Sequence, residues 1–313
     1  MTSLIRSIVV LCFSLGIACA AFARPEPQPI TQPTLAERGS ALYRFNQLDL
    51  SSADGTRPYR VWVGIPKGPV PAQGYPAIYM LDGNAALASL EDPMFAGLKG
   101  RALPVLVMIG YPVKDRFDVV SRAYDYTPPL PDNAPAPAEL ARGRRSGGAD
   151  SFADFIEQRV KPAVTALVKV DSTRQTLWGH SYGGLFAAHV LFTRPHAFQA
   201  YVMADPSLWW QGGYVLSQEQ RFSTSRPVRV LVMRGTAKTH DKGPQGSSEV
   251  SPEAARQLAH RLAVQPNMTV QYQELPLGHG PMFKASLLPA LRLAQAEQTR
   301  PGPDRATAPA PAQ

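Results

Sequence analysis

Cysteine is almost absent from this chain. Cys12 and Cys19 are the only two cysteines among its 313 residues. Both lie in an N-terminal segment that we interpret as a leader removed on export, so the mature chain would contain none. A mature chain without cysteine can form no disulfide, no thiolate metal site and no cysteine nucleophile. Any nucleophile it uses must come from another residue type.

Long apolar runs are also scarce, and the one that stands out is near the N-terminus. Arg6 precedes an apolar run from Ile8 to Ala20, and Ala21-Phe22-Ala23 follows it as a small-x-small sequence. This order is typical of a secretory signal peptide cleaved after Ala23. The run is short for a bilayer span, so an uncleaved anchor is the weaker alternative. We therefore expect a periplasmic or secreted protein without a stable membrane anchor.

Dense basic clusters are missing although the chain is basic overall. Lysine and arginine number 32 against 24 acidic residues, which gives a formal net charge of +8. These cations are scattered, and no aromatic-rich basic motif accompanies them, so the sequence indicates no nucleic-acid partner. The net charge would still favour a small anionic ligand. With 44% apolar and 18% charged residues, the chain can form a sizeable packed core.

Short apolar segments alternate with helical patterns along most of the chain. Strands are predicted at 57–65, 77–81, 104–110, 176–178, 200–204, 228–233 and 268–275, with helices at 151–168, 185–192 and 252–262. Such alternation predicts an α/β fold whose mainly parallel central sheet is covered by helices on both faces. We expect a flexible lead-in at 24–40, one domain at 41–296 with a mobile loop or lid at 127–149, and a disordered tail at 297–313.

One motif points to nucleophilic catalysis. Gly179-His180-Ser181-Tyr182-Gly183 matches G-x-S-x-G, follows a predicted strand and opens a predicted helix. In an α/β-hydrolase fold this arrangement makes a sharp, strained turn that presents the serine hydroxyl at the edge of the sheet. The sequence therefore predicts Ser181 as the nucleophile of an α/β-hydrolase.

A serine hydroxyl needs a base and a site that stabilises the oxyanion. His279 lies between two glycines in the loop after the last predicted strand, which is the usual place for the base. The backbone N–H of Tyr182 follows the nucleophile and is the first expected oxyanion donor. The second is expected from the loop after the strand at 77–81, with Asn84 favoured over Gly83.

The acid that would orient His279 is not fixed by the sequence. Asp241 lies late in the segment after the strand at 228–233, and Asp205 follows the strand before it. A Ser–His dyad, with a backbone carbonyl or a water orienting the imidazole, is the third possibility. All three remain open at this point.

Several stretches together resemble the periplasmic siderophore esterases, which cleave the trilactones of enterobactin and salmochelin. The shared stretches are Tyr79–Asn84, Ile109–Tyr111, Arg122–Pro128, Gly147–Asp150, Gly179–Phe186, Pro206–Trp210 and Gly278–Phe283. The resemblance covers about residues 40–295. It implies an esterase in which Ser181 and His279 form a dyad with no required carboxylate. Asp205 departs from the small residue expected before Pro206.

The resemblance also implies a substrate. A catecholate siderophore, ferric or iron-free, is anionic and aromatic, and suits arginine and aromatic side chains. Arg122, Trp209, Trp210 and Tyr111 are the candidate contacts, although Arg122 as a structural partner of Asp125 and the tryptophans as core residues are equally compatible. The chemistry requires no metal and no organic cofactor. The alternatives are a general carboxylesterase or acyltransferase, and a non-catalytic periplasmic protein that binds a ferric siderophore.

Overall fold

The computed structural model describes residues 28–98, 101–137, 140, 143–237 and 250–296. The expected signal peptide at 1–23, the first four residues of the expected lead-in (24–27) and the expected tail at 297–313 lie outside these residues. The rest of the expected lead-in is described, and it contains a short helix at Leu35–Arg38 in which Leu35 is buried. Among the described residues, no helix combines the length and the apolar character that a membrane span requires.

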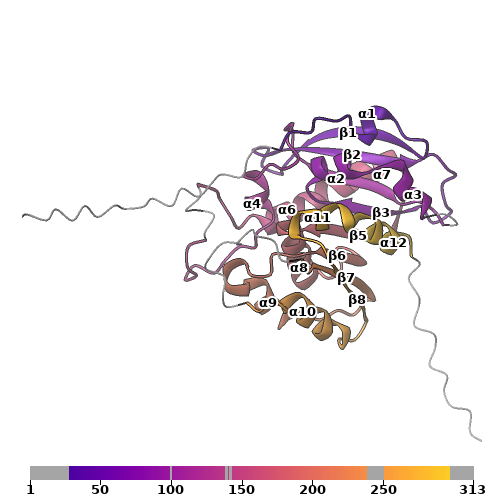
Figure 1. Cartoon of the computed structure of the whole chain (residues 1–313). Helices are drawn as coiled ribbons and strands as arrows, with labels where there is room; N and C mark the ends of the chain where they lie inside the picture. The colour runs from indigo at the N-terminus through magenta and orange to yellow at the C-terminus, as the bar shows by residue number, and fades with distance from the viewer. Residues whose placement is uncertain (1–27, 99–100, 138–139, 141–142, 238–249, 297–313) are drawn as a thin grey trace, which may run out of the picture.

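An eight-stranded sheet forms the centre of the molecule, in the order β1-β2-β4-β3-β5-β6-β7-β8 (Figure 1). The strands are β1 (Tyr43–Ser51), β2 (Pro58–Pro66), β3 (Tyr75–Met80), β4 (Val105–Gly110), β5 (Val170–His180), β6 (Ala200–Ala204), β7 (Val228–Gly235) and β8 (Met268–Leu275). Strands β3 to β8 run parallel, whereas β1 and β2 pair antiparallel at one edge. This mainly parallel sheet confirms the predicted α/β-hydrolase fold.

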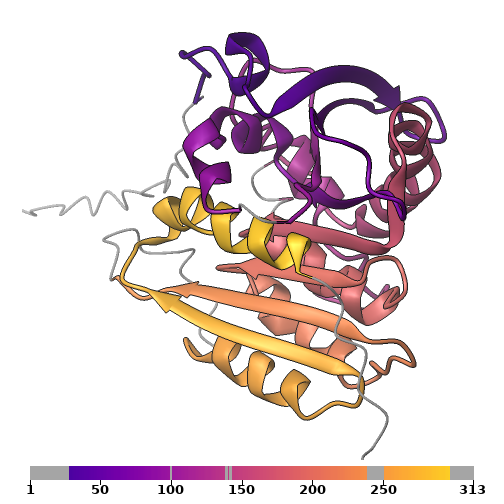
Figure 2. The same ribbon diagram turned by 90° about the vertical axis from the view of Figure 1, so that its right-hand side faces the viewer.

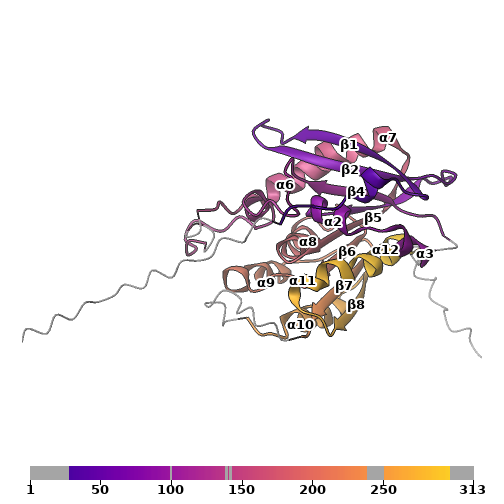
Figure 3. The same ribbon diagram turned by 45° about the horizontal axis from the view of Figure 1, so that its top comes forward.

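Helices cover both faces of the sheet, as Figures 2 and 3 show from two further directions. One face carries α1 (Leu35–Arg38), α2 (Gly83–Ser89), α3 (Asp92–Ala96), α11 (His279–Ala285) and α12 (Leu287–Gln295). The other carries α6 (Ala149–Phe155), η1 (Ile156–Val160), α7 (Lys161–Leu167), α8 (Tyr182–Thr193), α9 (Tyr214–Glu219) and α10 (Ala254–Ala263). The central strands β3, β4 and β6 are buried along their whole length, because side chains on both of their faces pack under helices.

Strand β1 was not predicted, because its burial alternates and its residues are largely polar. It extends to Ser51. A turn follows directly, where the Ser52 amide donates a backbone hydrogen bond to the Arg57 carbonyl. An edge strand has only one covered face, so its sequence lacks the continuous apolar run that marked the central strands.

The predicted loop at 127–149 is tied down at both of its ends. Thr127 is fully buried, and its hydroxyl accepts a hydrogen bond from the Gly147 amide. The Gly148 amide donates to the carbonyl of Tyr124. Midway, the side-chain amide of Gln211 donates to the Pro135 carbonyl. The end of the loop therefore lies beside its start, near Tyr124 and Thr127. The expected mobility of the loop stays a prediction.

We expect Gly179→Ala to destabilise the fold strongly. A Cβ at this position would overlap the backbone carbonyl of Gly183, so β5 and α8 could no longer approach as they do. Overpacking against a rigid backbone should lower the free energy of unfolding by about 3 kcal/mol. Urea denaturation measures this, with Gly68→Ala as the control, since a Cβ at Gly68 meets nothing within 4 Å. Equal stability of the two variants would contradict the close approach.

Candidate active site

The backbone at Ser181 is strained in the way that the motif predicts. Ser181 stands between the last residue of β5 and the first of α8, with φ 59° and ψ −119°. Its amide donates to the Ala204 carbonyl at the end of β6. A non-glycine residue in this region is held only where the surroundings enforce it, and such residues concentrate at functional sites. The turn places the Ser181 hydroxyl at the carboxyl edge of the sheet.

His279 reaches Ser181 from the segment that follows β8. It is the first residue of α11, and its Nε2 lies 3.0 Å from the Ser181 Oγ. Its side chain is about half exposed, with 49% relative accessibility, which leaves it reachable from solvent. This distance is within hydrogen-bonding range for a base that takes the hydroxyl proton. The structure therefore brings the predicted nucleophile and base together.

Asp205 completes a hydrogen-bonded chain with these two residues. Its Oδ2 lies 2.6 Å from the His279 Nδ1, and its Oδ1 accepts from the Gly235 amide at 3.2 Å. Partial burial alone would raise the pKa of Asp205, but the hydrogen bond and charge of His279 hold it below its usual value. Of the three arrangements left open by the sequence, the geometry matches Asp205. Asp241 lies outside the described residues.

The expected oxyanion loop lies beside the start of α8. Asp82, Gly83 and Asn84 follow β3, and a Cβ at Gly183 would sit 3.5 Å from the Leu81 side chain and 3.9 Å from an Asp82 carboxylate oxygen. A Cβ at Gly83 would come within 2.6 Å of the β4 backbone, so only glycine fits there. The Tyr182 amide opens α8 directly after the nucleophile, at the positive end of the helix dipole.

Two of the four predicted substrate contacts are wrong. Tyr111 is 3% exposed, and its hydroxyl donates to the buried Asp125. Trp210 is 1% exposed and belongs to the main core. Both are large aromatic side chains that the fold uses for packing, so neither can contact a ligand in solution.

The other two candidates differ in their surroundings. Arg122 is mostly buried and pairs bidentately with Asp82, at 2.8 and 2.9 Å, not with Asp125 as the structural alternative supposed. Trp209 is partly exposed, and its ring lies 6.2 Å from that of Tyr182. Trp209 is therefore the candidate that a substrate near Ser181 could reach most easily.

Sequence reasoning gave no role to His180 and Ser207, which both touch the site. The Nε2 of His180 donates to the His279 carbonyl at 2.8 Å, and its ring packs 4.6 Å from the His279 ring. The buried Ser207 hydroxyl lies 3.2 Å from the Ser181 Oγ, and its amide donates to the Ser181 carbonyl. His180 occupies a variable position of the G-x-S-x-G motif, so only the fold reveals its partner.

His180, Asp205 and His279 could also be considered as metal ligands, because one donor atom of each lies within 4.8 Å of the others. Hydrogen bonds already use these groups: His279 bonds Ser181 and Asp205, and the Nε2 of His180 bonds a carbonyl. Binding an ion there would break the contact between nucleophile and base. The arrangement fits proton transfer better than metal binding.

Burial of His180 predicts a pH dependence of stability. Burial lowers the pKa of His180 to about 3, whereas an unfolded histidine titrates near 6.5. Below pH 6.5 the unfolded chain therefore binds a proton that the folded chain does not, and stability falls by about 1.4 kcal/mol per pH unit. Between pH 7 and pH 5 the wild type should lose about 2 kcal/mol more than His180→Gln in urea denaturation. The exposed His260→Gln variant should follow the wild type; a His180→Gln curve parallel to the wild type would contradict the neutral, buried imidazole.

Comparison with known proteins agrees with this geometry. The model of the family described as putative esterase matches residues 52–274. The chain is 35% identical over 286 residues to the apo-salmochelin esterase of Escherichia coli O6:H1, covering 90% of this chain and 88% of the relative. It is 32% identical to the ferri-bacillibactin esterase BesA of Bacillus subtilis, covering 69% and 76%. A solved structure of the enterobactin hydrolase IroE in complex with DFP, 35% identical, superposes with a TM-score of 0.65 and covers 85% of this chain and all of that one. The chain belongs to the putative esterase family.

Proposed function

We propose that this protein is a serine esterase that hydrolyses the ester or lactone bonds of a catecholate siderophore. The observation that carries the chemistry is the chain of hydrogen bonds from Asp205 through His279 to Ser181. The relatives named for salmochelin and bacillibactin, and a solved relative named for enterobactin, support the substrate class. DFP is an inhibitor of serine hydrolases, so its complex with that relative supports the reaction type.

The proposed reaction follows from the positions of the three side chains. The Ser181 Oγ attacks the ester carbonyl while the His279 Nε2 takes the hydroxyl proton. Asp205 holds the Nδ1 of His279 protonated and stabilises the imidazolium that forms. His279 then gives the proton to the leaving alkoxide, which leaves an acyl group on Ser181. A water molecule, deprotonated by His279, attacks this acyl-enzyme. The bond to Ser181 then breaks, His279 returns the proton to the Ser181 Oγ, and the acid is released.

The tetrahedral intermediates carry a negative oxygen that must be stabilised. We assign the Tyr182 and Asn84 amides to this task, because Tyr182 directly follows the nucleophile and Asn84 lies in the loop after β3, the two places from which α/β-hydrolases supply such donors. Gly83 is the neighbouring alternative to Asn84. Trp209, partly exposed beside Tyr182, offers a flat face on which a catechol ring could stack. The N-terminal signal pattern supports a periplasmic or secreted site of action.

Replacing the nucleophile tests the proposed function. The purified mature chain should convert enterobactin to linear or monomeric dihydroxybenzoyl-serine, detected by mass spectrometry, and Ser181→Ala should lower this rate by at least about 10³-fold. Hydrolysis of p-nitrophenyl butyrate, followed in parallel, serves as the reference for a neutral ester.

Each other outcome identifies a different function. Turnover of the aryl ester alone would indicate a carboxylesterase or acyltransferase with another substrate. Tight binding of ferric enterobactin without turnover of either ester would indicate a binding protein. Unchanged hydrolysis by Ser181→Ala would contradict the nucleophile itself.

Replacing the acid distinguishes a triad from a dyad. In Asp205→Asn the carboxylate no longer stabilises the imidazolium, so kcat should fall by about 10³-fold while KM changes little. Steady-state kinetics on p-nitrophenyl butyrate measures both, and Asp241→Asn, the other candidate from the sequence, should retain the wild-type kcat. A kcat within about 3-fold of wild type for Asp205→Asn would mean that Ser181 and His279 act as a dyad.

A further inference from the structure

A short helix beside the site, α4 (Ser121–Asp125), has a composition that the proposed reaction does not explain. The sequence from Arg122 to Tyr126 places two charged and two aromatic residues within five positions. Arg122, Asp125 and Tyr126 are spaced i, i+3 and i+4, so they lie on one face of the helix. The expected oxyanion loop is Asp82–Asn84. Arg122 and Tyr126 contact Asp82 in this loop, and Asp125 contacts Tyr111, whose backbone binds the Asn84 side chain.

Two of these side chains hold Asp82. The guanidinium of Arg122 donates from Nε and Nη2 to the two carboxylate oxygens of Asp82, at 2.8 and 2.9 Å. The hydroxyl of Tyr126 accepts from the Asp82 amide at 2.9 Å. Asp82 itself is 2% exposed and has a left-handed backbone with φ 50°. A non-glycine residue in that conformation needs outside contacts to persist. Arg122 supplies one to the Asp82 carboxylate and Tyr126 another to the Asp82 amide.

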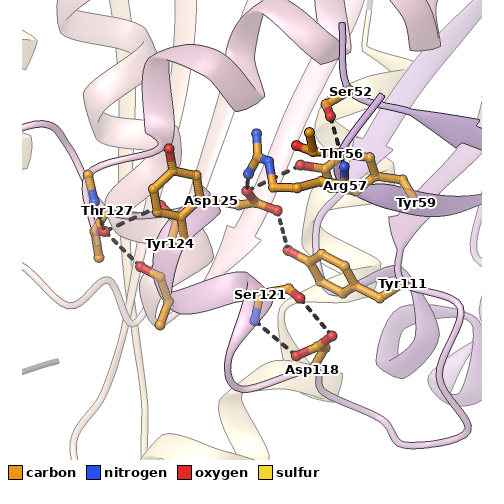
Figure 4. Close-up of polar contacts among 12 residues, drawn as sticks. Ser52, Thr56, Arg57, Tyr59, Tyr111, Asp118, Ser121, Tyr124, Asp125 and Thr127 are labelled. Carbon is orange, nitrogen blue, oxygen red and sulfur yellow. Dashed lines mark hydrogen bonds and ion pairs between the residues drawn. The ribbon is translucent and has the colours of Figure 1, made fainter. Parts of the chain in front are cut away.

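The third side chain holds Asn84 through Tyr111. The buried carboxylate of Asp125 accepts from the Tyr111 hydroxyl at 3.0 Å, and Figure 4 shows it between Tyr111 and the guanidinium of Arg57. The backbone of Tyr111 then binds the Asn84 side chain: its amide donates to Oδ1 at 2.9 Å, and its carbonyl accepts from Nδ2 at 3.0 Å. Gly110 leaves room for this contact, because a Cβ there would overlap Asn84 Oδ1.

Both ends of α4 are fastened, so the helix can act as a fixed support. Before it, the carboxylate of Asp118 accepts from the amide and the hydroxyl of Ser121, at 2.9 and 2.7 Å (Figure 4). After it, the Thr127 hydroxyl donates to the Ala123 carbonyl at 2.7 Å. A helix of five residues has little stability of its own, so these bonds fix its position.

We propose that α4 positions the oxyanion amide of Asn84, with Arg122 as the main positioning residue acting through Asp82. This inference rests on the proposed function, because it concerns the same serine chemistry. The Nε and Nη2 edge of Arg122 is occupied by Asp82 and is not open to a substrate, and the Arg122 side chain is only 14% exposed. Its guanidinium carbon also lies 5.4 and 5.5 Å from the ring centres of Tyr126 and Tyr182. The ion pair thereby links the oxyanion loop to the start of α8.

Hydrolysis of a neutral ester separates positioning from substrate binding. On p-nitrophenyl butyrate, Arg122→Gln and Asp82→Asn should each lower kcat by about 10- to 100-fold with KM within about 3-fold, since a displaced oxyanion donor acts on the transition state. The inhibition constant of butylboronic acid, whose tetrahedral adduct resembles that state, should rise by the same factor. Each rate is divided by the concentration of active sites that a fluorophosphonate probe labels at completion. A variant that is partly unfolded therefore does not appear to have a lower kcat.

The variants are chosen to exclude other roles of the charge. Arg122→Lys keeps the charge but not the bidentate fork, and should not restore kcat. The double variant of Arg122→Gln with Asp82→Asn should be no slower than the slower single variant, because the two residues act as one unit. Arg145→Gln removes another arginine beside α4, 4.5 Å from the Tyr124 ring, and should keep the wild-type kcat. Tyr126→Phe removes one oxygen and should lower kcat several-fold even if the Arg122 variants fail to fold.

Three results would overturn this inference. One is a normal kcat per labelled site in Arg122→Gln and Tyr126→Phe, which would make the contacts merely structural. A second is a loss confined to the KM for an anionic catecholate ester, which would make Arg122 a substrate contact. A third is full rescue by Arg122→Lys. Ser181→Ala, assayed alongside, keeps the two proposals apart: an active Ser181→Ala overturns the proposed function, whereas an inactive one with normal Arg122 variants overturns only the positioning role.

Discussion

The close approach of β5 and α8 at Gly179 and Gly183 is the constraint on which the site depends. Because no side chain separates the two backbones, the chain can reverse within the single residue Ser181, at φ 59°. That turn fixes the nucleophile at the carboxyl edge of the sheet. It also places the first amide of α8 immediately beside the nucleophile. A less sharp turn would separate Ser181 from His279, whose position is set independently by α11.

Left-handed backbone conformations gather at the same edge of the sheet. Asp82, Ser181 and Asp205 follow β3, β5 and β6, and each has a positive φ. Parallel strands end at one edge, so the loops that carry these strained residues converge there. The cost of this strain is offset by contacts outside the reacting atoms: Arg122 and Tyr126 hold Asp82, and the Gly235 amide holds Asp205.

The central fold could be predicted because its strands are buried on both faces and are therefore continuous apolar segments. Ser181 and His279 could be predicted because glycines mark the tight turns that carry them. Asp205 could not be chosen over Asp241 from spacing alone, since the choice depends on how β6 and β7 lie side by side. Tyr111 and Trp210 were assigned to the ligand from residue type, yet burial decides their role. The hydrogen-bond network around α4 joins residues that are distant in sequence, so no local sequence pattern predicts it.

The central claim is that Ser181 attacks a carbonyl whose oxygen is held by the Tyr182 and Asn84 amides. A crystal structure of the protein after reaction with a phosphonate ester inhibitor tests this most directly. We predict a covalent bond from the Ser181 Oγ to phosphorus, with the phosphonyl oxygen about 2.7–3.1 Å from both amide nitrogens. A phosphonyl oxygen directed away from the Asn84 amide, or phosphorus attached to another residue, would contradict the account.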